Sequence, residues 1–301
     1  MIIIDYSQVA ISNIFMFQNE LKTNNSDAKN AENIIRHTVL STIKSYRKKF
    51  GQEYGEIVIA CDGPNYWRRD FYSHYKANRA KAREKSGLDW GMVFDNLSLL
   101  KDDLEKYFPY KVINIDKCEA DDIIAVITKW SQTNDLDQSG IIENPKPILI
   151  VSSDHDFGQL QKYNNVRQWS PMQKKFIKQD NPVQYVIEHT VRGDSGDGVP
   201  SIYCEDDFFV NKDQYGKAPS VTTKKLSLFL EKGFNACQND VERRNWRRNQ
   251  TLVNFDFIPE EIQNSIVNEF LNKKINGDKN SIMNYLIKNK CRLLLNELED
   301  F

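Results

Sequence analysis

Three apolar runs in this chain each end on an aspartate, and the runs close at Asp5, Asp62 and Asp154. Short, nearly continuous stretches of isoleucine and valine are typical of strands buried on both faces, as in parallel sheets. A fourth run, over residues 111–115, leads within a few positions to Glu119 and further acids. In open α/β sheets, function gathers outside the carboxyl ends of the strands. The pattern therefore predicts a parallel sheet with many carboxylates in one crevice.

The chain alternates predicted strands and helices up to about residue 180. Strands are expected at residues 2–5, 56–61, 111–115 and 147–152, and helices at residues 30–50 and 91–109. Such a β-α-β alternation favours a mostly parallel sheet with right-handed crossovers, flanked by helices. We therefore expect an α/β domain over residues 1–180.

Beyond residue 180 the pattern is helical. Helices are expected at residues 182–192, 221–232, 241–255 and 259–273, with no convincing strand among them. Pro182 and Pro259 suit the first turns of their helices, and Gly233 suits a helix end. We therefore expect residues 181–301 to form a carboxyl-terminal helical region that packs on the α/β domain.

The net charge of −1 conceals a segregation of charge along the 301 residues. Residues 66–85 hold seven Lys or Arg against two Asp or Glu, and residues 217–250 hold eight against three. A nearly neutral total is therefore compatible with a basic binding surface around an acidic centre. At about 150 residues per domain, the length suits one large domain or two modest ones.

The five cysteines are widely spaced and never form a CxxC pair, so neither a zinc site nor a disulfide framework is expected. The opening apolar stretch has only three isoleucines before Asp5, so no signal peptide is visible. No run approaches the ~20 apolar residues that a membrane span requires. We therefore expect a soluble, cytoplasmic protein that does not bind membranes.

The acids at the predicted strand ends and in two loops form one set of candidate metal ligands. The set comprises Asp5, Asp62, Glu119, Asp121, Asp122, Asp154, Asp156, Asp194 and Asp197. Each acid alone has an ordinary structural explanation as a turn former or helix cap. Together they need protons or cations, because two carboxylates ~4 Å apart repel by roughly 4 kcal/mol at an effective dielectric near 20.

Oxygen ligands without nearby cysteine or paired histidine select Mg²⁺ or Mn²⁺ over zinc. Two such ions about 3.5–4 Å apart clamp the attacking and leaving oxygens of a phosphodiester. The acids therefore predict a site for two Mg²⁺ ions, with Mn²⁺ able to substitute. His155 lies between two of these acids and is expected to be only a neighbour of the metal, whereas His37, His74 and His189 are expected to be structural or surface residues.

Residues 66–85 combine positive charge with aromatic rings. If the segment is one helix, a single stripe on its surface is made of Arg68, Tyr72, Lys76, Arg79 and Arg83. Arg69 lies beside this stripe. Cations that follow a backbone, with rings for base stacking, are typical of nucleic-acid binding. The alternative is a solvated helix face, but such a face would mix the two signs of charge. A second and less specific basic group, around Lys224, Lys225 and Arg247, is interpreted as an anchor for duplex backbone.

These motifs resemble the 5′-nuclease (flap endonuclease) family, most of all its bacteriophage ribonucleases H. Glu119-Ala-Asp-Asp122, Asp154-His-Asp156 and Gly193-Asp-Ser-Gly-Asp197 together make a specific combination rather than a lone short motif. The remaining matching stretches are residues 4–12, 66–71, 76–79, 81–84, 168–172 and 254–259. The likeness covers residues 1–200 well and thins beyond them.

The resemblance implies a PIN-like or resolvase-like nuclease core with a basic helical arch over residues 66–90. It also implies two-metal hydrolysis of phosphodiesters, with 5′-exonuclease, flap endonuclease and ribonuclease H activity on DNA and RNA/DNA duplexes. Such an enzyme removes RNA primers and adjacent DNA during replication, here of a phage in its host's cytoplasm, and a single-strand-binding protein is a plausible partner.

By position in the family's motifs, Asp62, Glu119 and Asp121 would hold the first ion, with Asp5 near it. The second ion would be held by Asp154, Asp156 and Asp197, while Asp122 and Asp194 would act through water. Arg68 and Lys76 would approach the scissile phosphate from the arch.

Two features depart from the family's pattern. Gly198 stands where the family's acidic loop usually has asparagine. Residues 202–208 carry acids in place of a Gly-rich turn and a Lys-Thr pair, and these acids would repel a phosphate backbone. The sequence therefore disfavours a potassium-assisted duplex clamp.

Two other functions remain open at this point. One is a non-catalytic nucleic-acid-binding replication factor with a vestigial acidic site. The other is a PIN-type endoribonuclease, although such proteins are usually more compact than this chain.

Overall fold

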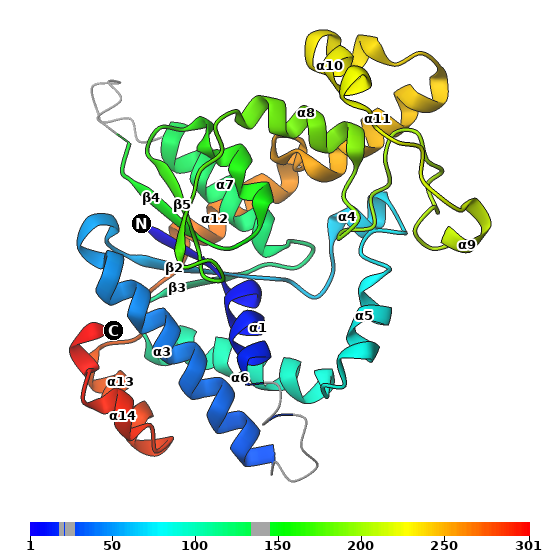
Figure 1. The fold of residues 1–301 in the computed structure, drawn as a ribbon. Helices are drawn as coiled ribbons and strands as arrows, with labels where there is room; N and C mark the ends of the chain where they lie inside the picture. The colour runs from blue at the N-terminus through cyan, green and yellow to red at the C-terminus, as the bar shows by residue number, and fades with distance from the viewer. Residues whose placement is uncertain (18–20, 22–27, 134–144) are drawn as a thin grey trace.

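The computed structural model describes residues 1–17, 21, 28–133 and 145–301. A six-stranded sheet in the order β3-β2-β1-β4-β5-β6 runs through the centre of this part of the chain (Figure 1). The strands are β1 (Ile2–Asp5), β2 (Ile57–Cys61), β3 (Lys111–Asn114), β4 (Ile148–Val151), β5 (Val166–Ser170) and β6 (Lys175–Ile177). The first five are parallel, and β6 pairs antiparallel with β5. The four predicted strands and the mostly parallel sheet are confirmed, whereas the hairpin of β5 and β6 was not predicted.

Strand β1 lies at the centre of the sheet, where Ile4 pairs with Ile59 of β2 and with Val151 of β4. Ile2, Ile3 and Ile4 are fully buried, as expected of a strand covered on both faces. The acids that follow β1, β2 and β4 consequently leave the sheet at the same edge.

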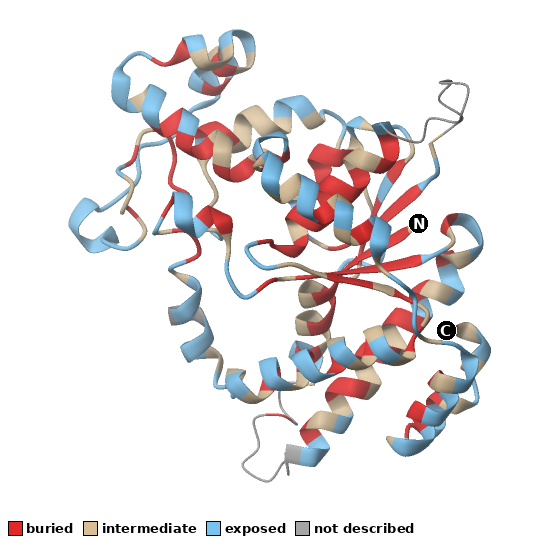
Figure 2. Cartoon of the chain, turned by 180° about the vertical axis from the view of Figure 1, so that it is seen from behind, coloured by how far each residue is buried: buried red, intermediate tan, exposed pale blue. Residues whose placement is uncertain are grey.

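Helices cover both faces of the sheet, and Figure 2 shows their buried sides turned towards it. One face is covered by α1 (Tyr6–Met16), α3 (Ala28–Tyr54), α6 (Trp90–Tyr107), α13 (Lys279–Lys288) and α14 (Arg292–Leu295). The other is covered by α7 (Ala120–Thr133), the 3-10 helices η1 (His155–Lys162) and η3 (Phe255–Phe257), and α12 (Glu260–Asn272). Residues 255–301 thus contribute to the hydrophobic cores on both faces of the sheet.

Four helices of the carboxyl-terminal region, with one short 3-10 helix, lie together on one side of the molecule (Figure 1). They are α8 (Pro182–Arg192), α9 (Lys212–Tyr215), α10 (Thr223–Lys232), η2 (Gly233–Ala236) and α11 (Asp240–Val253), and η4 (Leu298–Asp300) ends the chain elsewhere. Residues 181–301 are all described and contain no named strand, as predicted. Pro182 is in the first turn of α8, but Pro259 is the cap before α12 and not part of its first turn.

The basic segment over residues 66–85, in the connection from β2 to β3, is not the single helix that the stripe of cations required. The connection consists of α4 (Trp67–Phe71), irregular chain, α5 (Arg79–Ser86) and then α6, which together trace an arc in Figure 1. Lys76 has a φ of +56°, which no right-handed helix accommodates. The predicted helix is therefore wrong between Phe71 and Arg79. None of the described helices combines the length and apolarity needed to span a membrane.

Candidate active site

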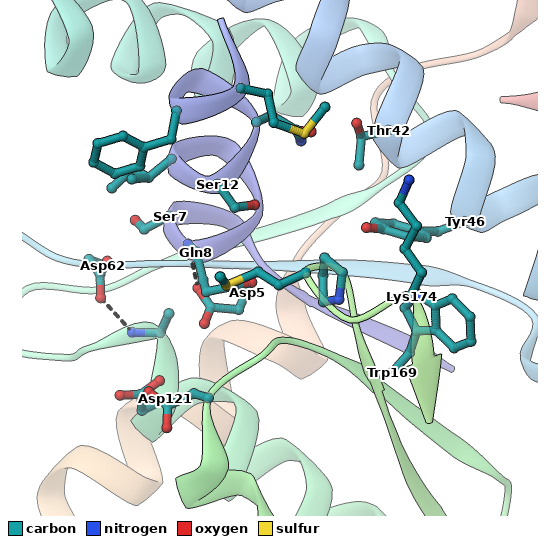
Figure 3. A pocket seen from close by; sticks show the side chains of 18 of the residues that line it. Asp5, Ser7, Gln8, Ser12, Thr42, Tyr46, Asp62, Asp121, Trp169 and Lys174 are labelled. Carbon is teal, nitrogen blue, oxygen red and sulfur yellow. Dashed lines mark hydrogen bonds between the residues drawn. The ribbon is translucent and has the colours of Figure 1, made fainter. Parts of the chain in front are cut away.

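Four acids meet in one pocket of about 1020 Å³ at the carboxyl edge of the sheet (Figure 3). Asp5 ends β1, Asp62 follows β2, Asp121 lies in the first turn of α7, and Asp154 follows β4. Lys76 and other cations also line the pocket. The sequence placed these carboxylates at a common crevice, and the structure brings them together there.

Backbone and hydroxyl donors hold these carboxylates in place. Asp5 accepts bonds from the Gln8 N–H and the Ser152 hydroxyl, both at 3.0 Å. The Ala120 N–H donates to Asp62 across 3.0 Å, so Asp62 joins the end of β2 to the start of α7. Gly63 is required beside it, because a Cβ there would lie 2.1 Å from the Ile115 carbonyl oxygen. The capping role expected of such acids therefore coexists with their position in the pocket.

The pocket disfavours full ionisation of its own acids. Burial, with Asp62 adding to it, raises the pKa of Asp5 to about 7. Burial and the neighbouring Asp154 raise the pKa of Asp121 well above its ordinary value. A bound cation would favour the ionised form of these carboxylates and lower their pKa values.

Glu119 is the buried acid to which the basic segment is anchored. The Arg68 guanidinium donates to Glu119 across 2.8 Å, the Lys76 ammonium forms an ion pair with it, and the Tyr75 hydroxyl lies 3.0 Å away. Burial alone would raise the pKa of Glu119, but Lys76 and Arg68 outweigh it and hold that pKa below its usual value. Glu119 is thus ionised and neutralised by the chain's own cations.

Asp122 does not line the pocket. Its carboxylate is fully buried, 2.8 Å from Arg68 and 3.1 Å from the Trp67 indole nitrogen, and it accepts the Glu119 N–H at 3.0 Å. Arg68 is only 2% exposed, and Tyr72 is buried as well, with its hydroxyl bonded to the Asp206 carbonyl. The expected single stripe is therefore divided between three interior side chains, Arg68, Tyr72 and Lys76, and the exposed Arg79 and Arg83, and Arg69 beside it is exposed as well.

Asp197 joins the basic segment to the acidic loop that follows α8. Its carboxylate accepts from the Tyr75 hydroxyl at 2.8 Å and from the Arg79 guanidinium at 2.6 Å, and the Lys76 ammonium lies 3.5 Å away. Gly198 follows with a φ of +73°, and a Cβ there would lie 2.9 Å from the His74 carbonyl oxygen. Glycine in place of the family's asparagine thus allows the loop to pack closely on this segment.

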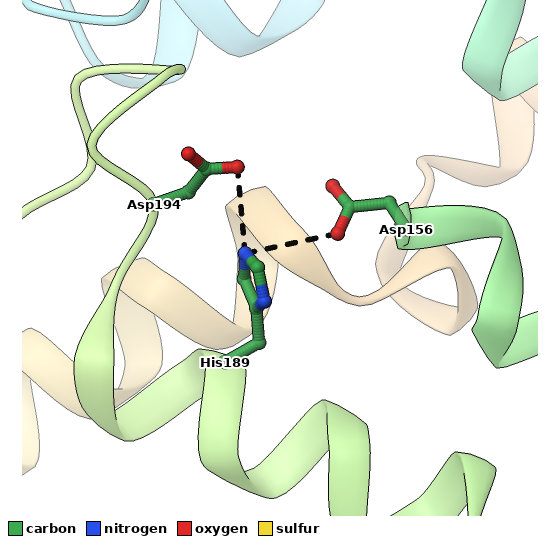
Figure 4. A group of neighbouring side chains, drawn as sticks. All are labelled: Asp156, His189 and Asp194. Carbon is green, nitrogen blue, oxygen red and sulfur yellow. Dashed lines mark hydrogen bonds and ion pairs between the residues drawn. The ribbon is translucent and has the colours of Figure 1, made fainter. Parts of the chain in front are cut away.

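Asp156, His189 and Asp194 form a second group beside the first (Figure 4). The His189 Nε2 lies 3.4 Å from an Asp194 oxygen and 3.7 Å from an Asp156 oxygen. Burial, with Asp154 next, raises the pKa of Asp156 to about 7, whereas His189 and two backbone N–H groups outweigh burial and lower the pKa of Asp194. The expectation that His189 is a structural or surface residue did not include these two acidic partners. The place of His189 in the last turn of α8, just before the acidic loop, was the available signal.

A further wall of the pocket was missed by sequence reasoning. The pocket extends from the acids over α1 to α3 and the turn between β5 and β6, where Lys49, Trp169, Met172 and Lys174 line it. The Lys49 ammonium lies 3.5 Å from the centre of the Trp169 ring. This end of the pocket thus pairs exposed cations with apolar and aromatic surface.

The second basic group is only partly available at the surface. Lys224, Lys225 and Arg247 are exposed and have no ion pair within the described parts of the chain. Arg244 and the buried Arg248 instead pair with Asp206, one of the acids expected to repel a phosphate backbone. That repulsion is consequently reduced.

Comparison with known proteins places these features in a family. Residues 1–189 match the 5′-3′ exonuclease, N-terminal resolvase-like domain, and residues 182–301 match the T4 RNase H C-terminal family. The chain is 35% identical to the ribonuclease H of Enterobacteria phage T4 over 99% of its own length and 95% of that protein's.

Solved structures of similar fold come from phage T5. A T5 protein co-crystallised with metal ions has a TM-score of 0.63 at 16% identity, covering 90% of this chain and 97% of that one. A T5 flap endonuclease in a pseudo-enzyme–product complex with DNA and metal ions has a TM-score of 0.57 at 18% identity, with the same coverage of both chains. These similarities confirm the predicted fold class.

Proposed function

The chain belongs to the 5′-3′ exonuclease family, and we propose that it is a metal-dependent 5′→3′ nuclease that removes RNA primers and adjacent DNA. Ribonuclease H, 5′-exonuclease and flap endonuclease activities would share one site. The observation that carries the proposal is the meeting of Asp5, Asp62, Asp121 and Asp154 in one pocket lined also by Lys76 and Arg79.

Two Mg²⁺ ions are the proposed cofactors, with Mn²⁺ able to replace them. The donors fit hard divalent cations because they are carboxylate oxygens, and burial disfavours ionisation of Asp5 and Asp121 when no cation is bound. Asp62, Glu119 and Asp121 would hold one ion, with Asp5 beside it, and Asp154, Asp156 and Asp197 would hold the other. Asp194 was expected to act through water, but its place beside Asp156 and His189 favours direct binding to the second ion. When bound, such ions activate water and neutralise charge on the phosphate. Asp122 is proposed to act through Arg68 and Glu119, which it contacts directly.

The chain's own cations would orient the scissile phosphate. Lys76 and Arg79 reach the pocket from the basic segment while they are paired with Asp197. A phosphate near the acids would take over part of this pairing and be neutralised by both side chains. Arg68 is enclosed by Glu119 and Asp122, so we assign it to holding Glu119 in position.

Nucleic acid is proposed to contact the exposed cations on either side of the acids. Arg69 and Arg83 lie on the arc, and Lys49 and Lys174 lie at the opposite end of the pocket beside Trp169. Phosphates would pair with the cations, and bases would stack on the rings. Lys224, Lys225 and Arg247 are proposed to bind duplex backbone farther from the acids.

The proposed biological setting is replication of phage DNA in the host cytoplasm. The substrates would be duplexes with 5′ ends or flaps, and a single-strand-binding protein is the proposed partner. Both statements rest on the likeness to phage nucleases and on the exposed basic residues.

Asp154→Asn tests the proposed catalytic role. Loss of a residue that only orients a metal ligand costs roughly 10–100-fold in activity. Loss of the ligand Asp154 itself should cost more than this, while the variant still binds a flap duplex. Asp180→Asn is the matched control, since Asp180 is 83% exposed and paired only with Lys178 among the described residues. Cleavage by Asp154→Asn at the wild-type rate would refute the assignment.

Two comparisons separate the remaining alternatives. Faster cleavage of single-stranded RNA than of a 5′-flap duplex would favour a PIN-type endoribonuclease. Activity that is flat across a Mg²⁺ titration would favour a binding protein with a vestigial site.

A further inference from the structure

The imidazole of His189 lies among acids that the proposed function assigns to the second cation. One ligand atom from each of Asp156, His189 and Asp194 lies within 4.8 Å of the other two (Figure 4). The three residues come from η1, the last turn of α8 and the loop after it. A nitrogen donor is thus present in a set that was expected to contain only oxygen.

Neighbouring groups fix the orientation of all three side chains. One Asp194 oxygen accepts the Gly196 N–H at 2.7 Å and the Asp197 N–H at 3.2 Å, which leaves the other oxygen facing His189. The Tyr185 hydroxyl donates to Asp156 across 2.8 Å, and its ring centre lies 5.2 Å from that of His189. Tyr185 and His189 are one turn apart on α8, so a single helix face positions both.

The spacing of the donors suits a single ion. Bonds of about 2.0–2.2 Å to nitrogen and oxygen put adjacent donors of one ion roughly 3.0–3.5 Å apart. The distances from the His189 Nε2 to the two carboxylates are 3.4 and 3.7 Å. An ion therefore requires only small side-chain movements to bind all three residues.

We propose that His189 is a nitrogen ligand of the second divalent cation and makes that site favour Mn²⁺ over Mg²⁺. The proposal rests on the proposed nuclease function and adds a residue that determines metal specificity. Imidazole suits transition metals, whereas Mg²⁺ prefers oxygen. The first site, formed by Asp5, Asp62, Glu119 and Asp121, carries no histidine and has no such preference.

A competing explanation is that the imidazole acts only as a positive counter-charge to Asp156 and Asp194. Both explanations place His189 between the two carboxylates when no ion is bound. They differ once an ion is added, because a ligand bonds to the ion and a counter-charge is displaced by it.

Pulsed electron paramagnetic resonance of the full chain loaded with Mn²⁺ distinguishes a metal-bound His189 from a His189 that acts only as a counter-charge. The wild-type protein should show modulation from a directly coordinated imidazole nitrogen, and His189→Gln should abolish it. His155→Gln is the matched control, since His155 is exposed beside the same acids, and it should keep the signal. Absence of the modulation from wild-type protein that binds Mn²⁺ would overturn the proposal without a variant having to fold.

Calorimetric titration gives a second readout. In His189→Gln, Mn²⁺ affinity at one of two sites should fall by about tenfold or more, and Mg²⁺ affinity should change less. Tighter Mn²⁺ binding in this variant would identify a counter-charge and overturn the proposal. Failure of the wild-type chain to bind any divalent cation would overturn the proposed nuclease function itself, so the two failures are distinguishable.

Discussion

The backbone N–H of Lys76 donates a 2.7 Å hydrogen bond to the carbonyl oxygen of Asp197. This bond attaches the irregular part of the arc, between α4 and α5, to the acidic loop after α8. Asn78 adds a second attachment, because its side chain donates to the Ser195 carbonyl across 2.8 Å. The side chains proposed to neutralise phosphate are thus held to a proposed metal ligand by the main chain.

Lys76→Ala should separate catalysis from metal binding. The ammonium pairs with Glu119 and Asp197, so its removal leaves carboxylates that attract a divalent cation more strongly. Metal affinity measured by calorimetry should rise, while kcat should fall by roughly 10²–10³-fold, as on loss of one preorganised charge. Lys288→Ala, an exposed lysine on α13, should change neither quantity. Unchanged kcat in Lys76→Ala would contradict the assigned role.

Arg68→Ala should destabilise the metal-free protein. Arg68 is buried against Glu119 and Asp122, and its loss leaves Asp122 without its cation and Glu119 with Lys76 as its remaining cation. Removal of one member of a buried ion pair typically costs about 3–5 kcal/mol. Urea denaturation should show a loss of this size, reduced when a divalent cation is added. Arg69→Ala, at an exposed position, should change the free energy of unfolding by no more than about 0.5 kcal/mol. An equally small change in Arg68→Ala would refute the structural role of Arg68.

The stability of the metal-free protein should depend on pH in an unusual direction. Burial raises the pKa of both Asp5 and Asp156 from 3.8 to about 7, so between these values the folded state binds more protons than the unfolded state. These two groups therefore make the free energy of unfolding fall as pH rises from about 4 to about 7. Urea midpoints measured in a chelator should fall across this window.

Divalent cations should reverse that dependence. Metal binding requires ionised carboxylates, so affinity should rise as pH increases through about 7, with release of protons. In saturating Mg²⁺ the urea midpoint should then rise with pH. Asp5→Asn should weaken both trends, and identical pH profiles with and without metal would exclude Asp5 and Asp156 as ligands.

Arg83→Ala should weaken nucleic-acid binding without affecting stability. Arg83 is exposed on α5, with its guanidinium 5.0 Å from the Phe94 ring centre. If it contacts a phosphate, the slope of log affinity against log salt should become shallower by about one unit. Fluorescence anisotropy with a flap duplex measures this slope. Lys178→Ala is the control, and an unchanged slope in Arg83→Ala would remove this residue from the interface.

The sheet and the acidic edge were predictable because both depend on local sequence. A run of three isoleucines predicts a strand that is buried on both faces, and Ile2, Ile3 and Ile4 are fully buried in β1. Asp5 follows them directly at the end of this strand. Parallel pairing then brings the acids after β1, β2 and β4 to one edge regardless of what lies between them.

The break in the basic segment was not predictable from helical periodicity. Residues 72–78 leave the helix because Tyr75 and Lys76 find partners in Glu119 and Asp197, which are remote in the sequence. A buried ion pair can override local helix propensity, and no window within residues 66–85 contains those acids. The contact between His189 and Asp156 was missed for the same reason, since Asp156 comes from a different element.

The most direct test of a divalent-metal nuclease site is a product ladder from 5′-labelled tailed, nicked and RNA-primed duplexes, with and without Mg²⁺. We expect short 5′ products from the tailed and RNA-primed substrates only when Mg²⁺ is present, and none from Asp154→Asn under either condition. Equal cleavage in a chelator, or no cleavage of any substrate at saturating Mg²⁺, would contradict the account.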